Sequence, residues 1–334
     1  MFKSTIIFLT LLVPTYVTSQ TTAPNIIPTD SYEEIFNPAD IKLTKKDFDK
    51  RIQNLVSRVT NNLESFSITE RKCDQNLLKN FSEARTKNPR GLHDEIYFLE
   101  GLTLEICGKL NDAKTSYEKS LNLRRNNPLV LYRLASILIR NKQHKEAAII
   151  IQEAEWQGFK EKYLLTFLKG AIEITEKNYS DAINLFQQSL FLNPNFLPAA
   201  KAQYRTRTEF RDVTKDPKVR AQLDNDIPLD LARLVSLDPE NMSYLFPYLR
   251  YLLSSGNILK SPMKLDEGLS LVENQLKNPK RNFSDFALLK VQFLEKLNKT
   301  GELMEYLKEL EKSKKITPVL KAKKDMLMQD IDEE

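Results

Sequence analysis

Small residues recur in this chain at intervals of 34 and 35 residues, and no other feature of the sequence constrains the fold as strongly. Each unit contains three of them, the second 12 residues after the first and the third 7 residues after the second. The three series are Gly101, Ala135 and Gly170; Ala113, Ala147 and Ala182; and Ser120, Ala154 and Ser189. A period of this length is typical of proteins built from stacked supersecondary units.

A larger residue lies four positions after the central alanine of each unit: Tyr117, Ile151 and Phe186. Small side chains at a helix crossing let two helices approach closely, and larger ones beside them fill the remaining space. A single pair of helices cannot bury its apolar face alone, so consecutive pairs stack on each other. The sequence therefore predicts an all-α solenoid of antiparallel helix pairs.

The repeated unit resembles the tetratricopeptide repeat over about residues 94–200. The third copy matches best, through Gly170, Tyr179, Ala182, Phe186, Ser189 and Pro194. It departs from the family's pattern at Thr166 and Glu173, and the first two copies lack the terminal proline at its usual place. The resemblance implies a right-handed superhelical solenoid in which the first helix of each unit lines a concave groove.

Weaker copies extend the array in both directions. Residues 46–93 fit a degenerate N-terminal helix pair, and residues 201–316 fit divergent repeats with insertions. A Thr-Pro pair is a favourable helix start, so residues 317–334 are expected to form a capping helix with an acidic end. We expect about six or seven helix pairs and this cap in one curved solenoid.

The first residues have the three parts of a secretory signal peptide. Lys3 supplies the positive charge, residues 6–13 form an apolar stretch, and small residues suit cleavage after Ser19. The alternative is a buried N-terminal helix. The signal peptide predicts an exported protein, in the periplasm or, as the alternative, outside the cell. Residues 20–45 contain several prolines without a sustained period and are expected to form a flexible leader.

The composition argues against most kinds of catalytic chemistry. Only 8 of the 334 residues are glycine, and the chain has 2 histidines and 2 cysteines. Phosphate-binding and dinucleotide-binding loops need glycines, and metal sites need clustered ligands. We therefore expect no cofactor, no metal site and no catalytic residue, and we interpret His93 and His144 as structural. The net charge of +5 gives no indication of a nucleic-acid partner.

When the repeats are aligned on their small residues, the resemblance predicts which side chains face the groove. The candidates are Phe98, Leu102, Tyr132, Ser136, Arg140, Phe167, Ala171, Lys201 and Arg205. They combine aromatic anchors with a basic end, which suits a protein or peptide segment as partner. The alternative is that the aromatic residues pack between units and that the cations are solvated. Trp156 lies at a unit boundary and is interpreted as a packing residue.

Cys73 and Cys107 are expected to form a disulfide. They are the only cysteines, and export would place them in an oxidising compartment. Their separation of 34 residues equals one repeat and predicts similar places on neighbouring first helices. The alternative is two buried free thiols that act as small apolar residues.

The features together favour a non-enzymatic, exported scaffold for protein–protein interaction, in the assembly or support of a bacterial envelope machine. A structural subunit of a polymeric periplasmic assembly, such as a flagellar or secretion accessory, is the alternative. A hydrolase that uses paired carboxylates across the groove is a weaker hypothesis. No transmembrane segment is expected in the mature chain, so contact with envelope assemblies would be peripheral.

Overall fold

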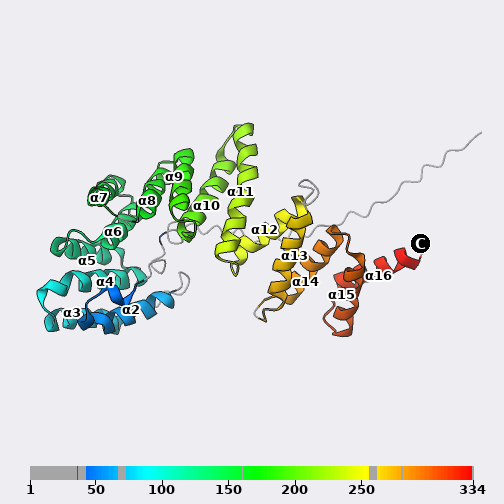
Figure 1. Ribbon diagram of the computed structural model, residues 1–334, viewed down its shortest axis with the longest axis horizontal. Coiled ribbons are helices and arrows are strands. Elements are labelled where there is room, and N and C mark those ends of the chain that lie inside the picture. Colours follow the sequence, from blue (N-terminus) through cyan, green and yellow to red (C-terminus); the bar gives the residue numbers. More distant parts are fainter. Residues whose placement is uncertain are drawn as a thin grey trace, which may run out of the picture.

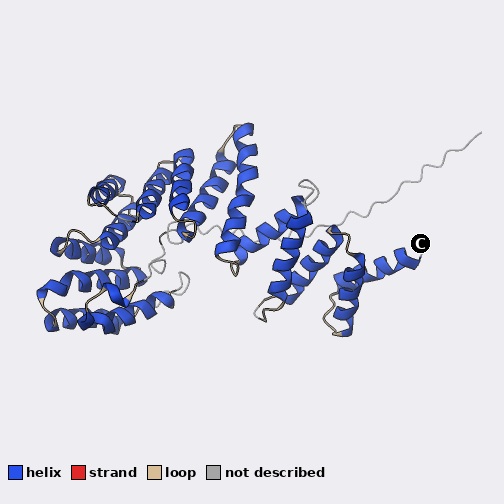
Figure 2. Cartoon of the chain, in the orientation of Figure 1, coloured by secondary structure: helices blue, strands red, loops and turns tan. Residues whose placement is uncertain are grey.

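The computed structural model describes residues 36, 43–66, 73–159, 161–255, 262–279 and 281–332. All regular secondary structure in these ranges is helical (Figure 2). The α-helices are α2 (Gln53–Glu64), α3 (Gln75–Lys87), α4 (His93–Ile106), α5 (Leu110–Leu123), α6 (Pro128–Arg140), α7 (His144–Trp156), α8 (Lys162–Thr175), α9 (Tyr179–Leu192), α10 (Leu197–Val213), α11 (Pro217–Leu237), α12 (Met242–Ser255), α13 (Pro262–Leu276), α14 (Phe283–Lys296), α15 (Thr300–Lys312) and α16 (Pro318–Asp332). The 3₁₀-helices η2 (Lys45–Asp47), η3 (Lys50–Ile52) and η4 (Arg90–Leu92) precede α2 and α4. The predicted signal peptide lies outside the described residues.

The α-helices form an extended, curved array. Counted two by two along the chain, those in the described ranges make seven pairs, from α2 and α3 to α14 and α15, and α16 follows as a single last helix. In the first of these pairs, α2 and α3 both pack against α4. In Figure 1 the helices from α2 to α11 follow an arc, with α6 and α8 on its inner side and α7 on its outer side. The all-α class that the sequence predicts is therefore confirmed, with the expected number of pairs.

The recurring small residues lie where two helices of one pair come into contact. A Cβ atom added at Gly101 would lie 2.4 Å from the ring of Tyr117, and one at Gly170 would lie 2.7 Å from the ring of Phe186. In the second unit the equivalent residues are Ala135 and Ile151, both buried. A glycine thus accompanies an aromatic ring, whereas an alanine accompanies a smaller side chain.

Replacing Gly101 with alanine is expected to lower the free energy of unfolding by about 1–3 kcal/mol, because the added methyl overpacks the helix crossing. Tyr117 cannot turn away freely, since its hydroxyl donates a hydrogen bond to Oε2 of Glu105 at 2.9 Å. Urea unfolding measures the loss. The matched control is Gly301→Ala, where nothing lies within 4 Å of the new Cβ atom. Equal unfolding energies for the two variants would contradict this explanation of the repeat.

The third small residue of the unit has a polar role that the sequence pattern does not reveal. Oγ of Ser120 donates a hydrogen bond to the carbonyl of Asp94 at 2.8 Å, and Oγ of Ser189 donates one to the carbonyl of Tyr163 at 2.8 Å. Both bonds join the end of the second helix to the start of the first. Ala154, at the same position of the middle unit, cannot make this bond.

One type of turn recurs inside four of the pairs. Gly108, Lys142, Lys177 and Asn298 have φ values of 72°, 60°, 63° and 55°. In each case the next amide donates a hydrogen bond to a carbonyl five residues earlier, as in the Schellman type of helix ending. Asn298 joins α14 to α15, so this distant pair has the same turn as the three central units.

Candidate functional site

The residues predicted to line the groove lie on α4, α6, α8 and α10, the first helices of four consecutive units. Six of them are at most 3% exposed: Phe98, Leu102, Tyr132, Ser136, Phe167 and Ala171. In the structure these six side chains are therefore covered, and none of them faces an open groove.

Residues from the N-terminal part of the chain cover this inner face. The ring of Phe48 is stacked on Phe98, with 6.4 Å between the ring centroids. The ring of Phe36 meets Phe167 edge-on at 5.7 Å and is 1% exposed. Phe36, which belongs to the predicted leader, is thus held against the inner face.

Helix α6 shows how complete this coverage is. Every residue from Val130 to Ile139 is buried, although a helix of a two-layer array ordinarily has one solvated side. Its outward side packs against α7. Its inward side carries Arg133, whose guanidinium contacts the backbone of Phe36.

A buried ion cluster lies beneath Phe36. Nε and Nη2 of Arg133 donate hydrogen bonds to the two carboxylate oxygens of Glu105, both at 2.7 Å. The carboxylate also accepts the hydroxyl of Tyr117, and Nη1 of Arg140 lies 3.7 Å from it. The predicted groove residue Arg140 is therefore an ion-pair partner of Glu105, and its guanidinium is already engaged.

Burial and charge both act on this cluster. Burial lowers the pKa of Arg133, but the charge of Glu105 offsets this effect, so the pKa is raised above its ordinary value. Burial raises the pKa of Tyr117 well above its usual range, and Glu105 adds to the shift. The guanidinium therefore stays charged and the phenol stays neutral at any physiological pH.

A second buried cluster joins α10 to α11. Nη1 of Arg207 and Nε2 of Gln203 donate to Oδ1 of Asp230, at 2.7 and 2.8 Å. Burial raises the pKa of Asp230 to about 6, although Arg207 acts in the opposite direction. Like Glu105, Asp230 is paired with a buried arginine.

Lys201 and Arg205 are the predicted groove residues that keep some exposure. Both are half-buried on α10 and form no ion pair with the described residues. Lys201 follows Phe167 by 34 residues and is the next inner position along the array. The inner face thus ends in two cations that have no counter-charge in the described part of the chain.

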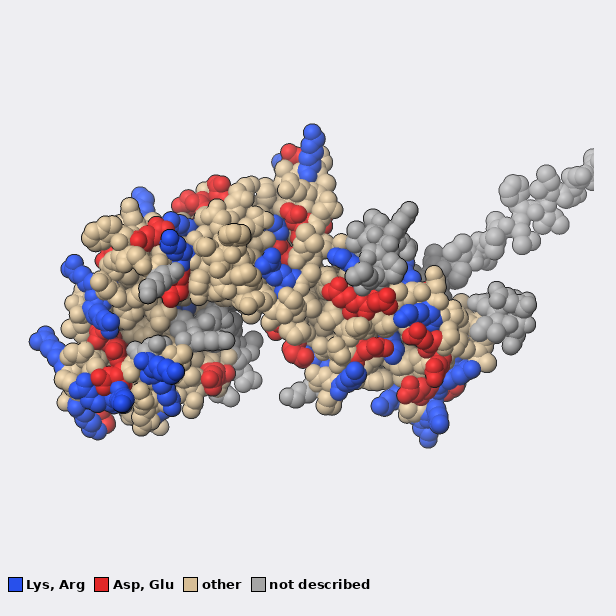
Figure 3. Space-filling model, viewed as in Figure 1, with Lys and Arg blue, Asp and Glu red and all other residues tan. Residues whose placement is uncertain are grey.

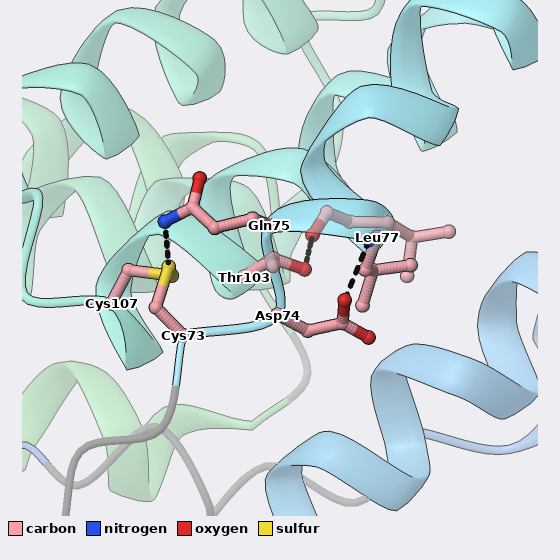
Figure 4. Close-up of a disulfide and its surroundings, with 7 residues drawn as sticks. Cys73, Asp74, Gln75, Leu77, Thr103 and Cys107 are labelled. Atoms are coloured by element: carbon pink, nitrogen blue, oxygen red, sulfur yellow. Dashed lines mark hydrogen bonds between the residues drawn. A yellow bond between two sulfur atoms is a disulfide. The ribbon is translucent and has the colours of Figure 1, made fainter.

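Cys73 and Cys107 form a disulfide, with 4.6 Å between their Cα atoms (Figure 4). Cys107 directly follows α4, as expected for the end of a first helix. Cys73, however, lies directly before α3, the second helix of its pair, rather than on a first helix. Nε2 of Gln75 donates to Sγ of Cys73 at 3.2 Å, and Asp74 caps α3 through the amide of Leu77.

Two exposed aromatic residues lie on the second helices of neighbouring units. Trp156 and Phe191 are each 87% exposed, so the interpretation of Trp156 as a packing residue is wrong. They lie two residues after Ala154 and Ser189, in equivalent positions near the ends of α7 and α9. The repeat pattern gives no signal for Phe191, because that pattern reflects only the positions that contact the partner helix.

Other features of the described residues indicate no chemical site. The histidines contact protein groups: Nε2 of His93 lies 2.9 Å from the carbonyl of Arg85, and Nδ1 of His144 lies 3.2 Å from Oγ1 of Thr175. Within the described ranges no group of three or more potential metal ligands occurs. No described helix has the length and apolar character that a membrane span requires. On the visible face, basic and acidic side chains are interspersed (Figure 3).

The sequence profile of the tetratricopeptide repeat matches residues 94–127, which contain α4 and α5. No curated protein matches the sequence. The chain is thus a helical repeat protein by its fold. Residues 94–127 match the tetratricopeptide repeat, which confirms the predicted resemblance in the first of the three units.

Several solved structures are similar in arrangement. One is PilW, a type IV pilus biogenesis factor, with a TM-score of 0.44, 12% identity, and coverage of 82% of this chain and 98% of PilW. A tetratricopeptide repeat protein from Parabacteroides merdae has a TM-score of 0.41, 15% identity, and coverage of 84% and 100%. A double mutant of MamA RS-1 has a TM-score of 0.40, 16% identity, and coverage of 59% and 99%. Since these scores lie below 0.5, the likeness tells nothing about the function of this chain.

Proposed function

We propose that this protein is an exported, non-enzymatic scaffold that holds a segment of a partner protein against the inner face of its helical array. The observation that carries the proposal is the binding of Phe36. This residue lies outside every helix, yet its ring and its backbone carbonyl both contact the inner face. A surface that binds one non-helical residue in this way is suited to bind a segment of another protein.

Export is part of the proposal. Residues 1–19 have the order of charge, apolar stretch and small residues that a secretory signal needs. A disulfide between Cys73 and Cys107 suits an oxidising compartment. The periplasm is favoured over the extracellular space, and support of an envelope machine is the favoured role. Mass spectrometry of the mature N-terminus tests export, with Gln20 expected as the first residue.

The basic end of the inner face gives the test of partner binding. Lys201→Glu combined with Arg205→Glu is expected to abolish capture of the native partner, because two attractive charges become repulsive. The melting temperature is expected to change by only a few degrees, since neither side chain has an ion-pair partner among the described residues. Quantitative mass spectrometry of material captured from the envelope fraction measures the loss.

The matched control is Lys215→Glu combined with Lys218→Glu, two exposed cations beyond the same helix. Equal capture by both double variants and the wild type would contradict binding at the inner face. Tyr132→Ala and Phe167→Ala do not serve this test. Both residues are buried, so truncation is expected to destabilise the fold by about 3–5 kcal/mol.

A structural subunit of a polymeric assembly remains the second candidate, and the exposure of Trp156 and Phe191 favours it. Large apolar side chains exposed at equivalent positions can form a repeated contact with another copy. Sedimentation velocity separates the two candidates. Concentration-dependent growth beyond a small oligomer supports the structural subunit, and a monomer at micromolar concentration supports the scaffold.

A further inference from the structure

Phe36 contacts the inner face through both its ring and its backbone. The ring lies against Phe167, and the carbonyl accepts a hydrogen bond from Nη2 of Arg133 at 3.3 Å. Because Glu105 binds the same guanidinium from the other side, the donor has a fixed direction. An aromatic pocket beside a fixed backbone donor is a subsite for one residue of an extended segment.

Phe36 lies far along the chain from the residues that bind it. It precedes Arg133 by 97 residues and belongs to no helix pair. The stacked pairs of a solenoid stabilise one another through neighbouring units, and such a distant residue is no part of that scheme. Phe36 therefore occupies the subsite as a ligand would, except that it is tethered.

The sequence around Phe36 indicates the charge of the ligand. Residues 30–41 contain Asp30, Glu33, Glu34 and Asp40 and no lysine or arginine. The next inner positions after Phe167 are Lys201 and Arg205, which are half-buried and have no ion-pair partner in the described part of the chain. An acidic segment and this basic end are complementary.

We propose that Phe36 is a tethered competitor of the partner, and that the partner is an acidic protein segment which inserts an aromatic side chain into the same subsite. This inference rests on the proposed function, since it names the partner's chemistry and the control of the same groove. A residue on a short tether has an effective concentration on the order of millimolar, so a free segment binds weakly until the tethered residue is displaced.

The probe for the test is a fluorescent synthetic peptide of residues 30–41, and fluorescence anisotropy measures its binding to the full mature chain. Phe36→Ala is expected to bind the peptide at least about tenfold more tightly than the wild type, because the tethered competitor is removed. A peptide with alanine in place of Phe36 is expected to lose binding. Binding is also expected to weaken as salt is added, since the exposed charges are screened.

Several outcomes would overturn the proposal. Equal peptide binding by the wild type and a folded Phe36→Ala chain, or no binding by either, would make Phe36 an ordinary core residue. If circular dichroism shows that Phe36→Ala has lost helix, Phe36→Leu is tested instead, because leucine keeps most of the apolar volume. The leucine variant is expected to bind the peptide with an affinity between those expected for the wild type and Phe36→Ala. An affinity equal to that of the wild type would contradict the proposal.

The oligomeric state and the native partner are separate questions in this test. A wild-type dimer that becomes monomeric in Phe36→Ala, seen by light scattering, would assign the subsite to Phe36 of a second copy and overturn intramolecular competition. The peptide assay involves no native partner. Failure of the envelope capture would therefore count against the proposed function alone, and failure of the peptide assay would count against the competitor alone.

Discussion

Replacing Glu105 with glutamine is expected to lower the free energy of unfolding by about 3–5 kcal/mol, because it removes one member of a buried ion pair and leaves the other charge without a partner. Glu105 and Arg133 are 0% and 1% exposed, so water cannot replace the lost carboxylate. Arg140, at 3.7 Å, loses the same counter-charge. Urea unfolding followed by circular dichroism measures the change.

The control for this variant is Glu83→Gln, which removes the charge from an exposed pair with Lys87. An effect of at most about 1 kcal/mol is expected there, as for surface ion pairs in general. If Glu105→Gln lowers the free energy of unfolding by no more than Glu83→Gln does, the buried cluster contributes little to stability. Because Glu105 also orients Arg133 toward Phe36, the glutamine variant is expected to weaken the hydrogen bond from Arg133 to the backbone of Phe36.

Loss of the disulfide is expected to destabilise the chain by about 3–4 kcal/mol in the chain-entropy model, as for any closed loop of this size. The loop spans 34 residues, from Cys73 before α3 to Cys107 after α4. Cys73→Ser combined with Cys107→Ser tests this without reductant. The effect is expected to concentrate in α2 and α3, because these are the first of the described helices and have described neighbours on one side only.

Hydrogen exchange followed by mass spectrometry locates the effect. The amides of α3 are expected to lose protection in the double serine variant, while those of α8 and α9 keep it. Uniform loss along the array would contradict a local role for the bridge. Two free thiols in protein purified from the exported compartment would show that the bridge does not form there.

The repeat residues explain why the fold was predictable. Gly101 and Gly170 must be small because aromatic rings occupy the space beside them, and a small residue recurs at this position in each of the three central units. A recurring constraint leaves a periodic trace in the sequence, and the number of helix pairs follows from it. The hydrogen bonds of Ser120 and Ser189 were not predictable, since alanine replaces serine in the middle unit and only residue size repeats.

The candidate site was less predictable because its covering residue leaves no periodic trace. Phe36 lies in a proline-containing stretch, and nothing in the local pattern indicates that it binds Phe167 and Arg133. Without that contact, the inner residues read as an open groove. The interpretation of Trp156 as a packing residue was wrong for the opposite reason. A large apolar residue at a unit boundary suggests packing, although exposed apolar side chains are ordinary in folded proteins.

The long sequence distance between Phe36 and its pocket has a consequence for the order of events during synthesis. Phe36 leaves the ribosome first, and 131 residues separate it from Phe167. At about 5–20 residues per second, roughly 7 to 26 seconds pass before Phe167 has been synthesised. Throughout that interval Phe36 has no pocket to bind, so the inner face can be completed only after the chain has grown well beyond Phe36.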